Sequence, residues 1–245
     1  MALDLVQVNF KAADEAALGR FWADALGWGV SSEAPGVANV EPHGFDWPDP
    51  SVVCVDVVAV PDPETVRYRA HLDLATSSAA HQEELVARLL TLGANRADIG
   101  QGDVPWTVMA DPEGNLFCVL EPRGLYADTG PIAAVVVGCS EPLATAGFWG
   151  DALGWDAYDA GADLARLRSP RGVGPFLEFV RQVDPGASSG RVHLDVLPGP
   201  GDDQDAEVAR LRSLGATDVD LGQGDVPWMC LADPEGNDFC VLRPR

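Results

Sequence analysis

The strongest constraint on the fold is that the sequence repeats itself. Residues 100–120, GQGDVPWTVMADPEGNLFCVL, return at residues 222–242 as GQGDVPWMCLADPEGNDFCVL, with 17 of 21 positions identical. FWADALGW at Phe21 recurs as FWGDALGW at Phe148, and HLDL at His71 recurs at His193. Two copies of one fold are therefore expected, over residues 1–123 and 131–245, with residues 124–130 as the linker.

Each copy shows the same order of strand and helix signals. In the first copy, apolar and β-prone runs predict strands over residues 5–10, 52–60 and 71–74, and two more flanking the turn signal at residues 111–115. Helical spacing of apolar residues predicts one helix from Asp14 to the glycine stop at Gly27 and another over residues 78–92. Each copy is thus predicted to contain two units in which a strand, a helix and further strands follow one another.

Composition and charge narrow the class of partner. The formal net charge is −22, from 38 acidic and 16 basic residues, and Lys11 is the only lysine. Such a surface repels phosphate backbones and acidic lipids, so neither nucleic acids nor membranes are expected as partners. The sequence shows no secretory signal and no apolar run of membrane-spanning length, and its five cysteines lack CxxC spacing. We expect a soluble cytoplasmic protein with reduced thiols and a small-molecule ligand.

The order of these motifs resembles the vicinal oxygen chelate superfamily, which includes glyoxalases, bleomycin-resistance proteins and extradiol dioxygenases. The resemblance rests on FW…LGW, HLDL and ADPEGNxFCVL, and it covers nearly the whole chain, twice. It implies an α+β fold of four βαβββ modules, paired into two domains whose curled mixed sheets surround cavities. Because single-copy relatives dimerise to complete their sites, the resemblance also implies a monomer with an internal pseudo-dimer, with a homodimer as the alternative.

The resemblance places candidate metal ligands on the first and last strands of each module. These positions are Gln7, Asp56, His71 and Cys118 in the first copy, and Ala134, Glu178, His193 and Cys240 in the second. Amide, carboxylate, imidazole and thiolate groups are competent ligands for a divalent metal such as zinc, nickel, manganese or iron, and the first set could form one site. Ala134 cannot ligate, and cysteine replaces the usual glutamate on both final strands.

The alternative for these residues, which we favour, is that no cofactor is bound. A cysteine on an apolar strand is commonly a small buried hydrophobe, and a histidine on a strand is commonly satisfied by a neighbour. Asp73 lies two positions from His71 on the same strand face and is its candidate partner.

Tryptophans at matching positions of the two copies suggest ligand contacts. Trp106 and Trp228 begin a predicted strand, and Trp28 and Trp155 follow the glycine that ends the first helix of each copy. Flat rings beside a concave sheet can hold an aromatic ligand with large contact area. We expect these four tryptophans, with Asp73 and Asp195, to contact the ligand. The alternative is a core position, which is expected for Trp22 and Trp149 on the apolar helix face.

Two functions remain open on the sequence alone. The first, which we favour, is a binding protein of the sequestration or resistance type that captures a small hydrophobic or aromatic compound. The second is a divalent-metal-dependent lyase, isomerase or dioxygenase, with no catalytic residue assigned. Gln7 against Ala134 and Leu116 against Asp238 put different chemistry at matching positions, which suggests that only one cavity is active.

Overall fold

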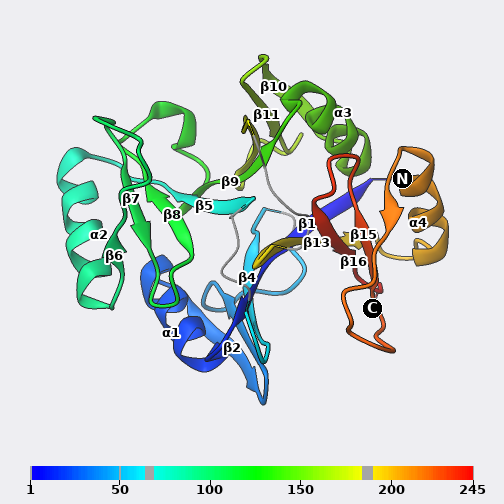
Figure 1. Ribbon diagram of the computed structural model, residues 1–245, viewed down its shortest axis with the longest axis horizontal. Helices are drawn as coiled ribbons and strands as arrows, with labels where there is room; N and C mark the ends of the chain where they lie inside the picture. Colours follow the sequence, from blue (N-terminus) through cyan, green and yellow to red (C-terminus); the bar gives the residue numbers. More distant parts are fainter. Residues whose placement is uncertain (1, 50, 64–68, 184–189, 245) are drawn as a thin grey trace.

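The chain folds into four βαβββ modules, two in each sequence repeat (Figure 1). The structure is a computed structural model that describes residues 2–49, 51–63, 69–183 and 190–244. No helix in these ranges is long and apolar enough to cross a membrane.

The first repeat contains modules 1 and 2. Module 1 comprises β1 (Leu3–Ala12), α1 (Glu15–Leu26), β2 (Gly29–Ala34), β3 (Val37–Glu41) and β4 (Cys54–Ala59). Module 2 comprises β5 (Ala70–Leu74), α2 (Ala79–Thr91), β6 (Asn95–Arg96), β7 (Thr107–Ala110) and β8 (Leu116–Val119). A single 3-10 turn, η1 (Gly124–Tyr126), lies in the segment that leads to the second repeat.

The second repeat contains modules 3 and 4. Module 3 comprises β9 (Ile132–Cys139), α3 (Pro142–Leu153), β10 (Asp156–Ala160), β11 (Leu164–Arg168) and β12 (Phe176–Arg181). Module 4 comprises β13 (Val192–Pro198), α4 (Gln204–Ser213), β14 (Thr217–Asp218), β15 (Met229–Ala232) and β16 (Asp238–Val241).

The modules combine into two eight-stranded sheets that each take one module from each repeat. Sheet A has the order β14-β15-β16-β13-β1-β4-β3-β2 and joins modules 1 and 4. Sheet B has the order β10-β11-β12-β9-β5-β8-β7-β6 and joins modules 2 and 3. The first strands of the paired modules meet antiparallel at the centre of each sheet, β1 on β13 and β5 on β9. Each sheet therefore contains strands from both sides of the linker at residues 124–130, and the division into domains at 1–123 and 131–245 stays a prediction.

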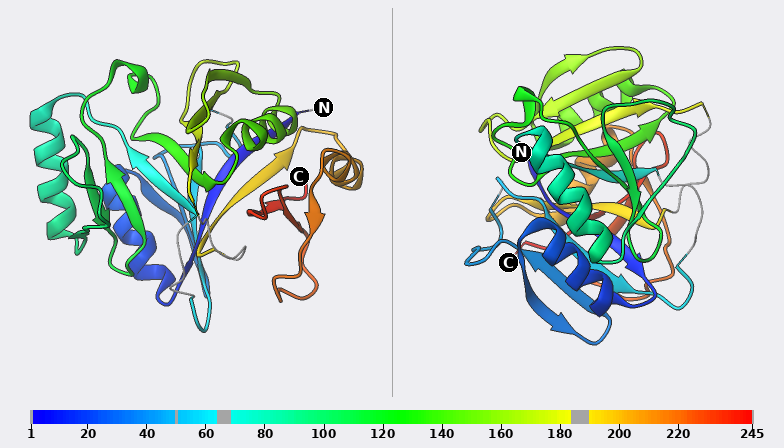
Figure 2. Two further views of the ribbon diagram at one scale, coloured as in Figure 1. Left: turned by 45° about the horizontal axis from the view of Figure 1, so that its top comes forward. Right: turned by 90° about the vertical axis from the view of Figure 1, so that its left-hand side faces the viewer.

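The helices, in contrast, remain grouped by repeat. α1 lies beside α2, and α3 lies near α4 at the other end of the molecule (Figures 1 and 2). The Arg88 guanidinium of α2 donates to the carbonyl of Ala25 at 2.9 Å, and Arg210 of α4 donates to the carbonyl of Ala152 at 2.9 Å. The two repeats thus exchange sheet partners while each keeps its own pair of helices together.

Local signals placed the main helix ends correctly. The Asp14 carboxylate accepts from the backbone N–H of Ala17 at 2.9 Å, and Gly27 ends α1 with a left-handed φ of 69°. Ser78 caps α2 in the same way as Asp14 caps α1. β2, β3 and β10 were not predicted, because their composition is mixed and gives no strand pattern. Pairing with neighbouring strands of the sheet holds these segments in the extended conformation that their local pattern does not indicate.

The repeated FW and ADPEGN motifs form a structural joint within each repeat. The Trp22 indole N–H donates to Asp111 Oδ2 at 3.3 Å, and its ring lies 5.2 Å from that of Phe117. Trp149 makes the equivalent bond to Asp233 at 3.0 Å. Trp22 and Trp149 are almost fully buried, as expected of core residues. These contacts hold α1 against the β7–β8 hairpin in the first repeat and α3 against the β15–β16 hairpin in the second.

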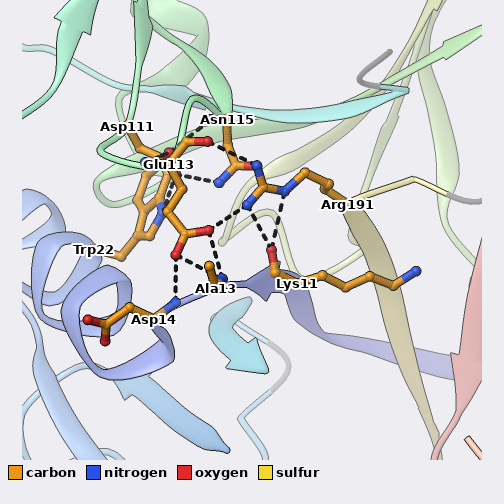
Figure 3. Close-up of polar contacts among 8 residues, drawn as sticks. All are labelled: Lys11, Ala13, Asp14, Trp22, Asp111, Glu113, Asn115 and Arg191. Atoms are coloured by element: carbon orange, nitrogen blue, oxygen red, sulfur yellow. Dashed lines mark hydrogen bonds and ion pairs between the residues drawn. The ribbon is translucent and has the colours of Figure 1, made fainter. Parts of the chain in front are cut away.

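Arg191 of the second repeat contacts the hairpin turn at residues 111–115 of the first repeat (Figure 3). The Glu113 carboxylate accepts from the backbone N–H groups of Ala13 and Asp14 at the start of α1. Arg191, which is 3% exposed, donates to Glu113 Oε2 at 2.5 Å and to the carbonyl of Lys11. Since β13 begins directly after Arg191, these contacts hold the start of module 4 against the hairpin turn of module 2 and against the end of β1 in module 1. The residues that recur in the ADPEGN part of the repeat thus have structural roles.

Candidate functional site

Sheet A holds a cavity with a volume of about 660 Å³. Its lining includes carboxyl, amide, imidazole, thiol and aromatic groups from modules 1 and 4. The lining side chains that carry charge or aromatic rings are Lys11, Glu41, Phe45, Asp46, Trp47, Asp56, His193, Asp195 and Trp228. The cavity therefore carries more polar and charged groups than the expected hydrophobic or aromatic ligand would require.

Strand register brings the polar groups of this cavity together. Asn9 on β1 lies opposite His193 of β13 on one side and Asp56 of β4 on the other. Gln7 lies opposite Asp195, and Asp195 lies opposite Cys240 of β16. Because side chains two positions apart share one face of a strand, these groups point to the same side of sheet A.

His193, Asp195 and Cys240 form a compact donor set on this face. Their nearest nitrogen, oxygen and sulfur atoms all lie within 4.8 Å of one another. His193 Nε2 is 3.3 Å from Asp195 Oδ1, and both side chains are only 5% exposed. An imidazole, a carboxylate and a thiolate at this spacing suit a divalent ion of intermediate softness, such as zinc.

Several polar atoms of the cavity wall lack a hydrogen bond within the described part of the chain. They are Asn9 Oδ1, His193 Nδ1 and Asp195 Oδ1, all on buried side chains. The 3.3 Å contact between His193 and Asp195 does not count as a hydrogen bond, so Asp195 Oδ1 remains unsatisfied. Buried polar atoms without partners cost stability, and such a group in a cavity wall indicates a place where a ligand or ion can supply the partner.

Asp56 and Gln7 form the second half of the polar wall. The Gln7 amide donates to Asp56 Oδ2, and both side chains are buried. Burial raises the pKa of Asp56 to about 7, and the nearby Asp195 and Glu41 carboxylates act in the same direction. Near neutral pH this carboxyl group can therefore hold or release a proton.

A second thiol lies against the donor set. Cys230 on β15 is directly opposite Cys240 on β16, and the two Sγ atoms are 3.8 Å apart. Gln223 Oε1 accepts from the Cys230 thiol at 3.1 Å and from the Trp228 indole N–H at 2.8 Å. The contact between the thiols lowers the pKa of Cys230 and raises that of Cys240. One glutamine thus connects the thiol pair to the aromatic wall.

The corresponding face of sheet B carries a related but different set. His71, Asp73 and Cys118 also lie within 4.8 Å of one another, with His71 Nε2 at 3.4 Å from Asp73 Oδ1. The His71 and Asp73 side chains are 25% and 12% exposed, against 5% for both groups in sheet A. Ala134 stands opposite Asp73, where sheet A has Gln7 opposite Asp195.

The linker residue Tyr126 fills the space beside this second set. Its hydroxyl donates to Glu178 Oε1 at 2.7 Å, and its ring packs edge-on against Phe176. Arg166 donates to the same Glu178 oxygen at 3.0 Å. The buried cluster around Tyr126 contains Ala134 and contacts Cys118, two of the positions predicted to face a cavity. Tyr126 therefore occupies in sheet B the place that is hollow in sheet A.

The expected groupings of site residues are corrected by this arrangement. Gln7, Asp56, His71 and Cys118 do not form one site, because the first pair lies in sheet A and the second in sheet B. Gln7 and Asp56 instead share a cavity with His193 and Cys240. Glu178 belongs to the other sheet, with His71 and Cys118.

The four tryptophans proposed as ligand contacts lie in different places. Trp228 lines the sheet A cavity. Trp106 lies at the Tyr126 cluster, with the Arg123 guanidinium 5.8 Å from its ring centroid. Trp28 lines a separate hollow of about 270 Å³ and Trp155 one of about 460 Å³.

Several residues of the cavity were not identified from the sequence. They are Asn9, Lys11, Asn39, Glu41, Phe45, Asp46, Trp47 and Gln223, and Cys230, which contacts Gln223 from outside the lining, was not identified either. A signal existed for the first two, because Gln7, Asn9 and Lys11 alternate with apolar residues along β1. The segment that carries Phe45 and Trp47 has no regular element, so its place at the cavity depends on tertiary structure.

The paired sheets and their buried donor sets define a protein of the vicinal oxygen chelate type. A family model described as a glyoxalase-like domain matches residues 7–120 and again residues 134–242. The chain belongs to this family and carries two copies of its domain.

Comparison with solved structures supports the same fold. Glyoxalase I from Zea mays has 14% identity and a TM-score of 0.66, with 98% of this chain and 92% of that chain covered. A "putative dioxygenase" from Bacillus subtilis has 13% identity and a TM-score of 0.61, with 98% and 84% covered. No curated protein matches the sequence. The expected α+β fold of four βαβββ modules is confirmed, and its two paired halves are consistent with an internal pseudo-dimer.

Proposed function

We propose that the sheet A cavity is the functional site and that it binds a small aromatic ligand carrying a positive charge. The observation that carries this proposal is the combination of aromatic and acidic side chains in one hollow. Phe45, Trp47 and Trp228 supply flat apolar surface. The volume of about 660 Å³ falls within the range typical of small-molecule sites, about 300 to 1,000 Å³.

The charge preference follows from the ionisable groups of the lining. Glu41, Asp46, Asp56 and Asp195 face a single cationic side chain that is always charged near neutral pH, Lys11. Burial raises the pKa of Asp56 to about 7, and even without Asp56 three acidic side chains of the lining stand against one lysine. A ligand ammonium group gains attraction from these carboxylates and from the indole faces, whereas a ligand carboxylate is repelled.

A matched set of probes tests this preference. An arylalkylamine, its N-acetyl derivative and the carboxylic acid with the same ring would be titrated against the protein, with tryptophan fluorescence and calorimetry as readouts. We expect binding of the amine alone or by a wide margin. Equal binding of the amine and the acid would contradict the charge argument.

The repeat supplies a control for the site itself. Trp228→Ala removes a ring from the sheet A cavity, and Trp106→Ala removes its counterpart in sheet B. Loss of a stacked ring should weaken amine binding by roughly tenfold in the first variant and leave it unchanged in the second. If Trp106→Ala weakens binding as much as Trp228→Ala, the site has been placed in the wrong sheet.

A metal-dependent lyase, isomerase or dioxygenase is the second candidate, favoured by the donor set of the same cavity. His193, Asp195 and Cys240 would hold the ion, with Gln7 and Asp56 beside them, and the unsatisfied atoms in this wall fit such a role. A bound divalent ion would act as a Lewis acid toward a substrate oxygen. Asp56, with its raised pKa, is the group of this chain that could accept or return a proton.

Metal binding can be tested without knowledge of the substrate. Zinc and cobalt titrations of untagged protein should show one strong site that is lost in His193→Ala and retained in His71→Ala, because the sheet B set is more exposed and adjoins Tyr126. Absence of stoichiometric uptake of zinc, nickel, manganese and iron(II) would remove the metalloenzyme candidate. Binding of the amine probe is measured separately, so the two candidates are distinguished.

A further inference from the structure

The second repeat contains a pair of thiols placed for a cross-strand bond. Cys230 and Cys240 are directly opposite in the antiparallel ladder of β15 and β16, with their Sγ atoms 3.8 Å apart. Opposed residues in such a ladder have Cα atoms about 4.5 to 5.5 Å apart, within the range of about 4.4 to 6.8 Å that disulfides use. Side-chain rotation alone can therefore bring the sulfurs to bonding distance.

The two sulfurs differ in access. Cys240 is buried and lines the cavity, whereas Cys230 is half-buried and touches the exposed loop residue Gln223. A small oxidant can thus meet Cys230 first, while Cys240 lies next to it as the resolving thiol. Cys54 and Cys139 are buried elsewhere, on β4 and β9.

The first repeat provides a natural comparison. Cys118 occupies the position that corresponds to Cys240, but its opposite residue on β7 is Val108. The thiol pair is therefore present only in the sheet that contains the large cavity. The same backbone arrangement without a second sulfur serves as an internal reference.

We propose that Cys230 and Cys240 are a modification site for peroxides, at which oxidation joins β15 to β16 through a reversible disulfide. With hydrogen peroxide, the Cys230 sulfur bonds to one peroxide oxygen as the O–O bond breaks, which gives a sulfenic acid and one water. The Cys240 sulfur then attacks the sulfenic sulfur, the S–O bond breaks, and a second water leaves with the Cys240 proton. Two thiols are oxidised by two electrons, and the peroxide is reduced to two waters.

The bond would change the cavity wall at two points. It turns the Cys240 sulfur away from His193 and Asp195, with which it now forms a set within 4.8 Å. It also removes the thiol donor from Gln223, whose other contact is the Trp228 indole. Oxidation would therefore alter both the donor set and the aromatic wall, whichever of the two proposed functions the cavity serves.

Mass spectrometry of the full chain tests this proposal without any ligand. Treatment with hydrogen peroxide should remove two of the five thiols, with a mass loss of two hydrogen atoms, and digestion should yield one peptide pair joined through Cys230 and Cys240. Dithiothreitol should restore all five thiols. Stable oxidation of Cys230 to a sulfinic acid without the cross-link, or a cross-link between other cysteines, would overturn the proposal.

Two valine variants complete the test. Cys230→Val reproduces the Val108 arrangement of the first repeat and should lose the disulfide entirely, while Cys118→Val should behave as the unmodified protein. A cross-link that survives in Cys230→Val would refute the assignment. The peptide map of the unmodified chain decides the matter by itself, so the proposal stays falsifiable even if either variant fails to fold.

Discussion

Replacement of Asp56 by asparagine should change how stability depends on pH. Burial raises the pKa of this carboxyl group from 3.8 to about 7, so the folded state binds its proton more tightly than the unfolded state does. Between these two pKa values the unfolded chain releases the proton and the folded chain retains it, and stability falls as pH rises. The full difference between the two pKa values corresponds to a loss of about 4 kcal/mol of stability above neutral pH.

Asparagine keeps an acceptor for the Gln7 amide and cannot ionise. The free energy of unfolding would be measured with urea in the presence of a chelator. The value for Asp56→Asn should exceed that of the unmodified protein by an amount that grows from about pH 4 to about pH 8. The difference between variant and unmodified protein isolates Asp56 from other titrating groups. Replacement of the exposed Asp24 by asparagine is the matched control and should give parallel curves. If Asp56→Asn also parallels the unmodified protein, the carboxyl group titrates as it does in water and the argument from burial fails.

Three further substitutions test a buried hydrogen bond beside sheet B, a buried carboxylate in sheet A and the ion pair between the two repeats. Tyr126→Phe removes the hydroxyl donor to buried Glu178 and should cost about 1 to 3 kcal/mol in urea unfolding; no loss would mean that this bond is not formed. Asp238→Leu copies the residue of the first repeat and removes a buried carboxylate that lacks hydrogen bonds within the described residues, so thermal stability near pH 8 should rise; a lower melting temperature would contradict this. Arg191→Met breaks the ion pair with Glu113 and should cost about 3 kcal/mol; a change below about 0.5 kcal/mol would show that the pair does not hold the modules together.

Local sequence signals predicted much of the framework because their causes are local. Asp14 and Gly27 bound α1 through a side-chain cap and a left-handed backbone, both of which depend on a few neighbouring residues. The proximity of His71 Nε2 to Asp73 Oδ1, at 3.4 Å, follows from the two-residue period of a strand. The hairpin turn at Asp111 was likewise predicted from its proline and glycine. The joint it forms with Trp22 was not, because the partners are 89 residues apart.

The candidate site was only partly predictable, since its residues come from distant segments. The resemblance identified Gln7, Asp56, His193 and Cys240 as inward-facing positions, and all four line one cavity. The role of Tyr126 beside Glu178 had no signal, because the linker composition that surrounds it says nothing about where its ring packs. Cys230 is a similar case, since its importance depends on the register of β15 against β16.

The sequence by itself determined that the chain is a duplication, the order of the helices and of most of the longer strands, and the chemical types of the inward-facing residues. Only the tertiary structure decided which modules share a sheet. It thereby decided that Gln7 and Asp56 lie with His193 and Cys240, and that Glu178 lies with His71 and Cys118. The physical reason is that pairing between modules depends on contacts between residues far apart in the chain, which local apolar patterns do not specify. Long-range contacts such as Arg191 with Glu113 connect the repeats in the observed arrangement. They leave sheet A hollow, while the linker ring of Tyr126 packs into sheet B.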